Sequence, residues 1–177
     1  MRGRILCGVV AVALLGCADA PPPTEPEYAV PVYSQRGENG AGAGSLATHL
    51  SGGEEVPARQ TRAQGQARFQ LSPDGTQLRY KLIVAIENVT QAHIHLGAFG
   101  TNGPIVVWLY PSAPPAQHIP GRTTGVLAEG VIDDADVIGL LAGQGVAGLL
   151  EQIAAGSTYV NVHTTLYPPG EIRGQLD

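Results

Sequence analysis

The run Leu78-Arg79-Tyr80-Lys81-Leu82-Ile83-Val84-Ala85-Ile86-Glu87 carries the clearest structural pattern in the chain. Apolar or aromatic side chains occupy every second position from Leu78 to Ile86, and the charged side chains fall between them. A period of two residues places alternate side chains on opposite faces of an extended strand. The run therefore predicts a β-strand with one face against a core.

A turn signal stands directly before this run. Ser72-Pro73-Asp74-Gly75 combines residue types that favour tight turns, and residues 64–71 before it form another predicted strand. We therefore expect the two strands to pair as a hairpin. Further strands are expected at residues 91–96, 104–110, 124–131, 157–164 and 171–176.

Residues 133–155 follow a different, helical spacing. Asp133 is a suitable N-cap, and Gly156 is a suitable stop for the apolar positions between them. These positions are Val137, Leu140, Leu141, Val146, Leu149, Leu150, Ile153 and Ala154. We expect a mostly β chain: an antiparallel, Greek-key-like β-sandwich or flattened barrel of roughly seven or more strands, with two short helices inserted near residues 133–155.

The first 16 residues have the layout of a secretory signal peptide. Two arginines precede an apolar run from Ile5 to Leu15, which is shorter than the roughly 20 residues of a transmembrane helix. The run ends in Leu14-Leu15-Gly16-Cys17, which resembles the lipobox of bacterial lipoproteins. The resemblance implies lipidation of Cys17 and an exported, membrane-anchored lipoprotein of the periplasm or cell surface. The alternative is ordinary cleavage near residues 18–20, which would release a soluble secreted protein.

The remaining chain divides into a tether and a domain. Residues 17–45 are rich in Pro and then in Gly, which predicts an extended segment, whereas residues 46–177 carry the strand patterns. The net charge is -5. No polybasic patch follows the signal peptide, so we exclude nucleic acid as a partner. The expected partners are the membrane, through the lipid on Cys17, and another envelope or extracellular protein.

Two of the predicted strands carry histidine on their polar faces. His93 and His95 alternate with apolar residues in one strand, and His163 does so in another. Period-two geometry puts His93 and His95 about 7 Å apart on one face. A short loop links the strand of His163 to the last strand, so His163 and Glu171 are expected to flank the same turn. These four residues converge if both histidine strands belong to one sheet.

Three segments of this domain are distinctive. They are Ala92-His93-Ile94-His95-Leu96-Gly97 followed by Gly100-Thr101-Asn102-Gly103-Pro104, Tyr159-Val160-Asn161-Val162-His163-Thr164 followed by Pro169-Gly170-Glu171-Ile172-Arg173-Gly174, and Leu50-Ser51-Gly52 with Glu54-Glu55-Val56-Pro57. Together they resemble the CHRD domain, which is named from chordin, over about residues 45–177. The resemblance implies an extracytoplasmic module, and it assigns no catalytic residues.

The histidines and the neighbouring carboxylate form a candidate metal site. His93, His95 and His163 with Glu171 are ligand types that suit Zn or Cu. The alternative is a polar sheet face on which the histidines hydrogen-bond neighbouring side chains. Asn161 and Arg173 lie on the same predicted polar faces, and they are weaker candidates for binding.

Two function classes remain open. His93-Ile94-His95 with the glycines that follow is similar to the copper-ligand strand of Cu/Zn superoxide dismutase, which makes a metal-dependent enzyme the alternative function. The chain lacks the zinc loop and the disulfide cysteines of that family. We therefore favour a non-enzymatic binding or structural module and assign no catalytic residue.

Overall fold

The alternating run Leu78–Glu87 forms strand β3, which pairs antiparallel with the whole of β2 (Gln64–Leu71). The turn between them is closed by the backbone amide of Ser72, which donates to the Gln77 carbonyl at 2.8 Å. The predicted hairpin is therefore confirmed. The computed structural model describes residues 45–177; the predicted signal peptide, Cys17 and the tether up to residue 44 lie outside the described residues.

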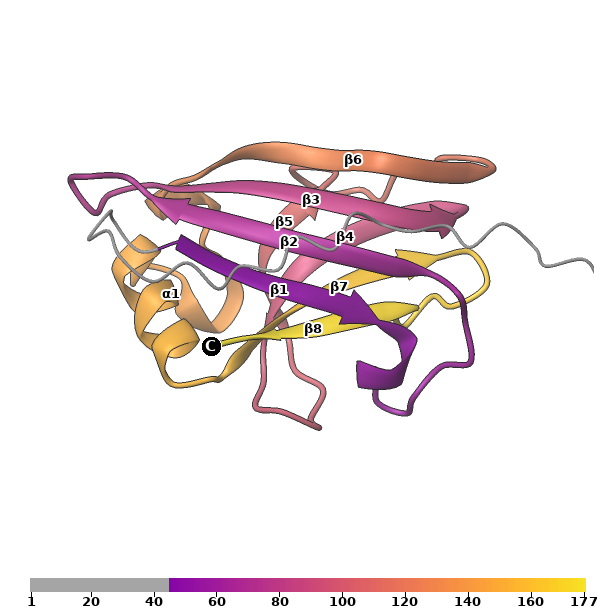
Figure 1. The fold of residues 1–177 in the computed structure, drawn as a ribbon. Coiled ribbons are helices and arrows are strands. Elements are labelled where there is room, and N and C mark those ends of the chain that lie inside the picture. The colour runs from indigo at the N-terminus through magenta and orange to yellow at the C-terminus, as the bar shows by residue number, and fades with distance from the viewer. Residues whose placement is uncertain (1–44) are drawn as a thin grey trace, which may run out of the picture.

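Between residues 45 and 177, eight strands form a single antiparallel sheet. The other six are β1 (Ser45–Ser51), β4 (Val89–Leu96), β5 (Ile105–Tyr110), β6 (Arg122–Ile132), β7 (Thr158–Thr164) and β8 (Ile172–Leu176). Their spatial order is β5-β4-β7-β8-β1-β2-β3-β6. The sheet curls until its two end strands, β5 and β6, come into contact, so the fold is a nearly closed barrel (Figure 1). The barrel alternative of the predicted fold is thus the one that the chain adopts.

Strand β1 is the element of this sheet that the sequence pattern did not predict. Its exposed side includes the apolar Ala47, whereas the polar Thr48 is half-buried on the side of Leu50. These two residues blur the alternation of apolar and polar positions on which the strand prediction depends. The strand is stabilised by pairing along β2 and by a single pairing of Ser51 with Arg173 of β8.

The helical segment is partly as predicted. Helix α1 (Gly145–Ala154) corresponds to the second predicted helix and buries Val146, Leu149 and Ile153. The prediction of the first helix is wrong, because its residues form two separate 3-10 turns, Asp134–Asp136 and Gly139–Leu141. Asp133 does cap the first turn, through a hydrogen bond from the Ala135 amide. Gly139 has a φ of 62°, which lies outside the α-helical region and interrupts the segment.

One wall of the barrel is buried on both faces. The inner face of this wall, which is formed by β4, β7 and β8, contributes Ile94, Val160, Val162 and Ile172 to the core. All seven residues of β7 are buried, so its outer face is covered as well. Three connecting segments cover it, and each is hydrogen-bonded to the wall or to its neighbour: residues 52–63, 97–104 and 165–171.

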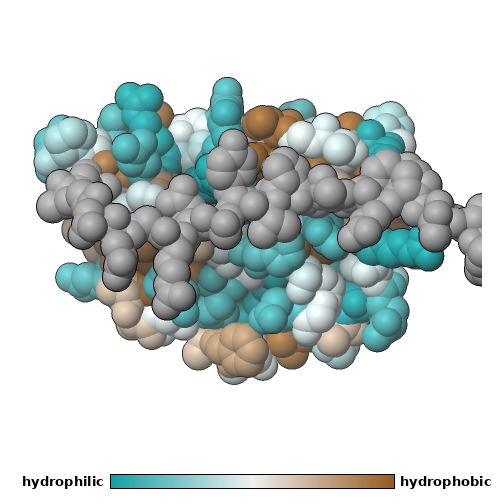
Figure 2. Space-filling view, viewed as in Figure 1, coloured by the Kyte–Doolittle hydropathy of each residue, from teal (hydrophilic) through white to brown (hydrophobic). Residues whose placement is uncertain are grey.

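The opposite wall is open to solvent. Strand β6 exposes about every second residue, including Val126 and Val131. On the face shown in Figure 2, hydrophobic residues appear as small separate patches among hydrophilic ones. Between residues 45 and 177, no helix combines the length and the hydropathy that crossing a bilayer requires.

Candidate metal centre

The register of three strands positions the polar side chains of the covered wall. Strand β4 pairs with β7, so that His93 lies opposite Asn161 and His95 lies opposite Tyr159. Strand β7 pairs in turn with β8, which places Asn161 opposite Arg173. The apolar residues between these positions point into the core, so the polar ones must lie on the outer face. The condition on which the convergence depended, that both histidine strands belong to one sheet, is therefore met.

His93, His95 and His163 come together on this outer face. One ring nitrogen from each can be chosen so that all three atoms lie within 4.8 Å of one another. The ring centroid of His93 is 5.5 Å from that of His95 and 4.9 Å from that of His163. The three side chains are 0%, 8% and 5% exposed. The structure thus brings together the three predicted histidines, and it buries them.

Backbone carbonyls orient two of the three rings. Nδ1 of His95 lies 2.8 Å from the Gly103 carbonyl, and Nδ1 of His163 lies 2.8 Å from the Pro168 carbonyl. A carbonyl oxygen only accepts hydrogen bonds, so both Nδ1 atoms carry the proton. Nε2 of each neutral ring is then left with a free lone pair. Holding a histidine by a carbonyl behind its ring is the usual outer-shell arrangement of metal-binding histidines.

The third ring completes the cluster. Nδ1 of His93 lies 3.0 Å from Nε2 of His163. Because that Nε2 holds a lone pair, Nδ1 of His93 donates the hydrogen bond. Nε2 of His93 and Nε2 of His95 are buried and have no hydrogen-bond partner among the residues that the structure describes. Buried polar atoms normally find a partner, so these nitrogens mark a place for a further group.

Burial keeps the cluster neutral at physiological pH. It lowers the pKa of His93 to about 3, helped by repulsion from His163 and His95. Burial also lowers the pKa of His95 to about 4, against the hydrogen bond to Gly103, and it lowers the pKa of His163. A neutral imidazole is the form that binds metal ions. These rings therefore need not release a proton to solvent before they bind a metal ion.

Aromatic residues enclose two of the rings. His93 packs edge to face against Trp108, with centroids 4.3 Å apart, and His95 stacks on Tyr159 at 4.8 Å. The guanidinium of Arg173 lies 3.4 Å from the centroid of the same tyrosine. Trp108 was not among the predicted site residues. The alternation of Trp108 with the buried Val107 and Leu109 could have indicated its outer face, but not its strand partner.

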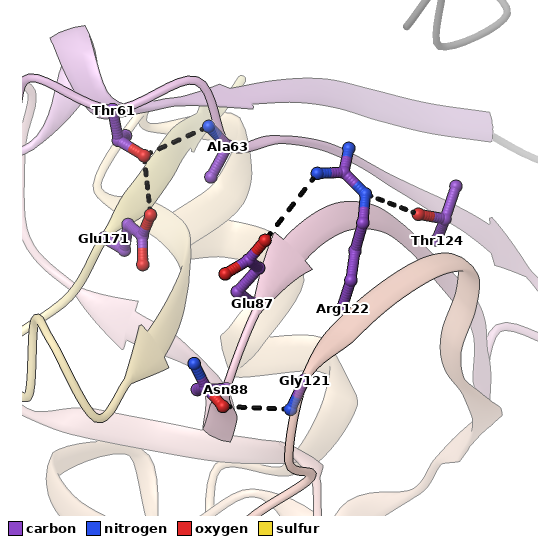
Figure 3. A network of polar contacts seen from close by, with 8 residues as sticks. All are labelled: Thr61, Ala63, Glu87, Asn88, Gly121, Arg122, Thr124 and Glu171. Carbon is purple, nitrogen blue, oxygen red and sulfur yellow. Dashed lines mark hydrogen bonds and ion pairs between the residues drawn. The ribbon is translucent and has the colours of Figure 1, made fainter.

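The structure does not bring Glu171 into the cluster. Its two carboxylate oxygens accept hydrogen bonds from the hydroxyls of Thr61 and Thr164, each at 2.6 Å, and the Thr61 contact is visible in Figure 3. Glu171 does flank the same turn as His163, as expected. Its carboxylate ties this turn to the segment before β2 and leaves the histidine cluster without a carboxylate ligand among residues 45–177.

Asn161 and Arg173 belong to an adjoining polar network. Nδ2 of Asn161 donates to Oε1 of Glu55 at 2.7 Å, a partner that the sequence analysis did not identify. Burial raises the pKa of Glu55 to about 7, against the attraction of Arg173. Arg173 itself is 2% exposed and donates to Asn102 Oδ1 at 3.3 Å and to the Ala98 carbonyl at 3.4 Å. Both predicted binding residues therefore support the wall around the cluster.

Comparison with known protein families finds a match for this domain. The model described as the CHRD domain matches residues 46–176, which include all three histidines and the loops that orient them. No curated protein and no solved structure matches the chain.

Proposed function

The chain belongs to the CHRD domain family, and from this premise we propose that it is an extracytoplasmic, lipid-anchored module that binds one transition-metal ion through His93, His95 and His163. Membership of the family supports a binding or structural module. The histidine cluster supports metal binding by that module, and the lipobox-like segment that ends at Cys17 supports its location at a membrane.

The observation that carries the metal proposal is the convergence of three buried, neutral imidazoles whose rings are held from behind. Metal–nitrogen bonds of about 2.0–2.1 Å in a tetrahedral site place neighbouring ligand nitrogens about 3.3 Å apart. Nδ1 of His93 and Nε2 of His163, at 3.0 Å, are already near that separation. Binding by both shifts the His93 proton from Nδ1 to Nε2, which leaves the total charge of the ring unchanged.

The donor set favours zinc or copper as the ion. Imidazole nitrogen suits both metals, whereas calcium and magnesium prefer oxygen ligands. The three rings are at most 8% exposed, and the loops that hold them close the outer face. A catalytic metal needs a position that is open to substrate, so the burial favours metal binding over the dismutase-like alternative.

Metal binding by the purified full-length protein tests this proposal. We expect one Zn²⁺ or Cu²⁺ ion per chain by elemental analysis after dialysis, and a saturable isotherm by calorimetry. The chain has one tryptophan, Trp108, so bound copper should also quench its fluorescence through the contact with His93. His163→Ala should weaken binding by more than about 100-fold, since it removes a direct ligand.

The matched control is His49→Ala. His49 is an exposed histidine of β1 that lies outside the cluster, so its removal should leave affinity and stoichiometry unchanged. Equal affinity of the His163→Ala and wild-type proteins, with both folded by circular dichroism, would contradict the proposal. So would a wild-type protein that retains no metal and shows no saturable binding.

A further inference from the structure

The three histidine rings lean toward one intermediate row of the sheet. The register puts His163 opposite Gln91 and His95 opposite Tyr159, so the two histidines lie four residues apart along the paired strands, about 13 Å. Their ring centroids are only 5.9 Å apart. Both rings therefore bend toward the row between them, which β4 and β7 fill with His93 and Asn161. Asn161 is thus the cross-strand neighbour of the central histidine, His93.

The amide of Asn161 is held in a single orientation. Its nitrogen donates to Oε1 of Glu55, and the same nitrogen packs so closely against Gly170 that a Cβ there would collide with it. This hydrogen bond places the amide nitrogen, and not the amide oxygen, against the carboxyl group of Glu55. Oδ1 of Asn161 consequently points away from Glu55.

That oxygen is a buried acceptor with no hydrogen-bond partner among the described residues. Asn161 is 2% exposed, and Oδ1 shares its unpartnered state with Nε2 of His93 and Nε2 of His95. An unpartnered acceptor in the interior costs free energy unless a donor is supplied. A metal ion on Nε2 of His95 that also carries a ligand with a donor hydrogen would satisfy that nitrogen and Oδ1 of Asn161 together.

A metal ion bound by three histidines lacks a fourth ligand. Zinc in proteins is almost always four-coordinate. Glu171 is engaged by two threonines, and the loops cover the rings, so the fourth ligand must be small. Water fits this description, and it can donate to a neighbouring acceptor while its oxygen binds the metal.

We propose that Asn161 is a positioning residue whose Oδ1 accepts a hydrogen bond from a metal-bound water molecule, and that Glu55 holds the amide in this orientation. The inference rests on the proposed metal site and adds the fourth ligand and its outer shell. Glu55 stands 106 residues before Asn161 in the chain, and it comes from the segment that covers the outer face. Covering the face and orienting the amide are thus two effects of one segment.

Two pairs of variants test the inference in the full-length protein. Asn161→Leu removes the acceptor and retains a similar volume, and it should weaken zinc binding by about 10–100-fold, the usual cost of losing an outer-shell partner. Glu55→Leu frees the amide and should weaken binding in the same direction. Glu55→Gln keeps an oxygen that accepts from Asn161, so it should bind zinc like the wild type. Gln175→Leu removes a polar side chain elsewhere on this face and serves as the matched control.

Spectroscopy separates positioning from a general loss of structure. The Cu²⁺ form of the wild type should show the deuteron coupling of a bound water by pulsed electron paramagnetic resonance in D₂O, and the Co²⁺ form should have a four-coordinate absorption spectrum. Both signatures should change in Asn161→Leu and Glu55→Leu, and both should persist in Glu55→Gln and Gln175→Leu.

Two outcomes would overturn the inference and leave the metal site standing. One is a wild-type holoprotein without an exchangeable water; the other is an Asn161→Leu protein with wild-type affinity and spectra. If Asn161→Leu does not fold, the comparison of Glu55→Leu with Glu55→Gln shows whether the orientation of the Asn161 amide affects zinc binding. Glu55 lies outside the strands, so these variants disturb the sheet less. Absence of metal from the wild type would defeat both the inference and the proposed function.

Discussion

The carboxyl group of Glu55 links the stability of the barrel to pH. It is 6% exposed, and burial raises its pKa from 4.5 to about 7, although Arg173 and Arg59 oppose the shift. The folded state therefore binds more protons at this group than the unfolded state between pH 4.5 and 7. The contribution of Glu55 to stability is present in full below pH 4.5 and is lost as the pH rises through 7.

At the scale of the residue, we predict that Glu55→Gln raises stability at high pH. Gln keeps the oxygen that accepts from Asn161 and removes the buried charge, so the free energy of unfolding at pH 8 should increase by about 1–2 kcal/mol. At pH 5 the variant and the wild type should unfold at similar urea concentrations. Glu54→Gln, at an exposed neighbouring position, is the control. An equal effect of Glu55→Gln at pH 5 and pH 8 would refute the linkage.

At the scale of the element, the loop between β4 and β5 holds the ring of His95. Gly103 is fixed at both of its backbone groups, since its amide donates to the Tyr159 hydroxyl at 3.1 Å and its carbonyl faces His95 Nδ1. The residue also passes so close to the Leu96 carbonyl that a Cβ would overlap it. The amide of Leu96 donates to Pro104 at 2.9 Å, which anchors the end of the loop. The carbonyl that orients His95 therefore belongs to Gly103, whose backbone is held on both sides and in close contact with Leu96.

We predict that Gly103→Ala damages both the fold and the site. The overlap forces the loop away from β4, so the free energy of unfolding measured in urea should fall by at least about 2 kcal/mol. Metal affinity should fall as well, because His95 loses its orienting carbonyl. Gly100→Ala in the same loop is the control: its φ is 74°, but open space surrounds it, so it should cost only about 1 kcal/mol and leave metal binding intact. Similar effects of the two variants on metal affinity would contradict this role of Gly103.

At the scale of the whole molecule, the barrel has one wall open to solvent and one wall closed by three connecting segments. The closed wall contains the histidine cluster and Arg173. Side-chain hydrogen bonds to backbone carbonyls hold the covering segments, one of which carries Glu55, in place. Such a layer is rigid, because each loop satisfies polar groups of the wall that would otherwise be buried without partners. The domain is thus built to hold a site in fixed geometry.

The proposed membrane anchor is tested at the same scale. We predict that Cys17→Ala moves the protein from the membrane fraction to the soluble fraction, because the acyl chains on Cys17 are the proposed attachment. Cys7→Ala is the matched control, since Cys7 lies within the apolar run of the signal and would be removed with it. Persistence of the Cys17→Ala protein in the membrane fraction after a carbonate wash would refute lipidation as the anchor.

Local patterns in the sequence were sufficient to predict most strands and the faces of His93, His95 and His163. The alternation in residues 78–87, the turn at residues 72–75 and the short link before Glu171 each act within a few bonds, where covalent geometry leaves few choices. The same alternation placed His93 and His95 on one face. Thr48 and Gly139 lie where local patterns were insufficient, because pairing with β2 fixes the first segment and a hydrogen bond from the Ile138 amide to the Val106 carbonyl holds the second.

Tertiary structure alone decided how the site is completed. It joined His93 to His163 across 70 residues, supplied the Gly103 and Pro168 carbonyls, placed Trp108 beside His93, and engaged Glu171 with threonines rather than with the histidines. Contacts of this kind depend on which strands become neighbours in the barrel, and that choice minimises the free energy of the whole chain rather than of any segment. The three histidines of the cluster could therefore be identified from the sequence, whereas their common orientation arises only when the covered wall closes.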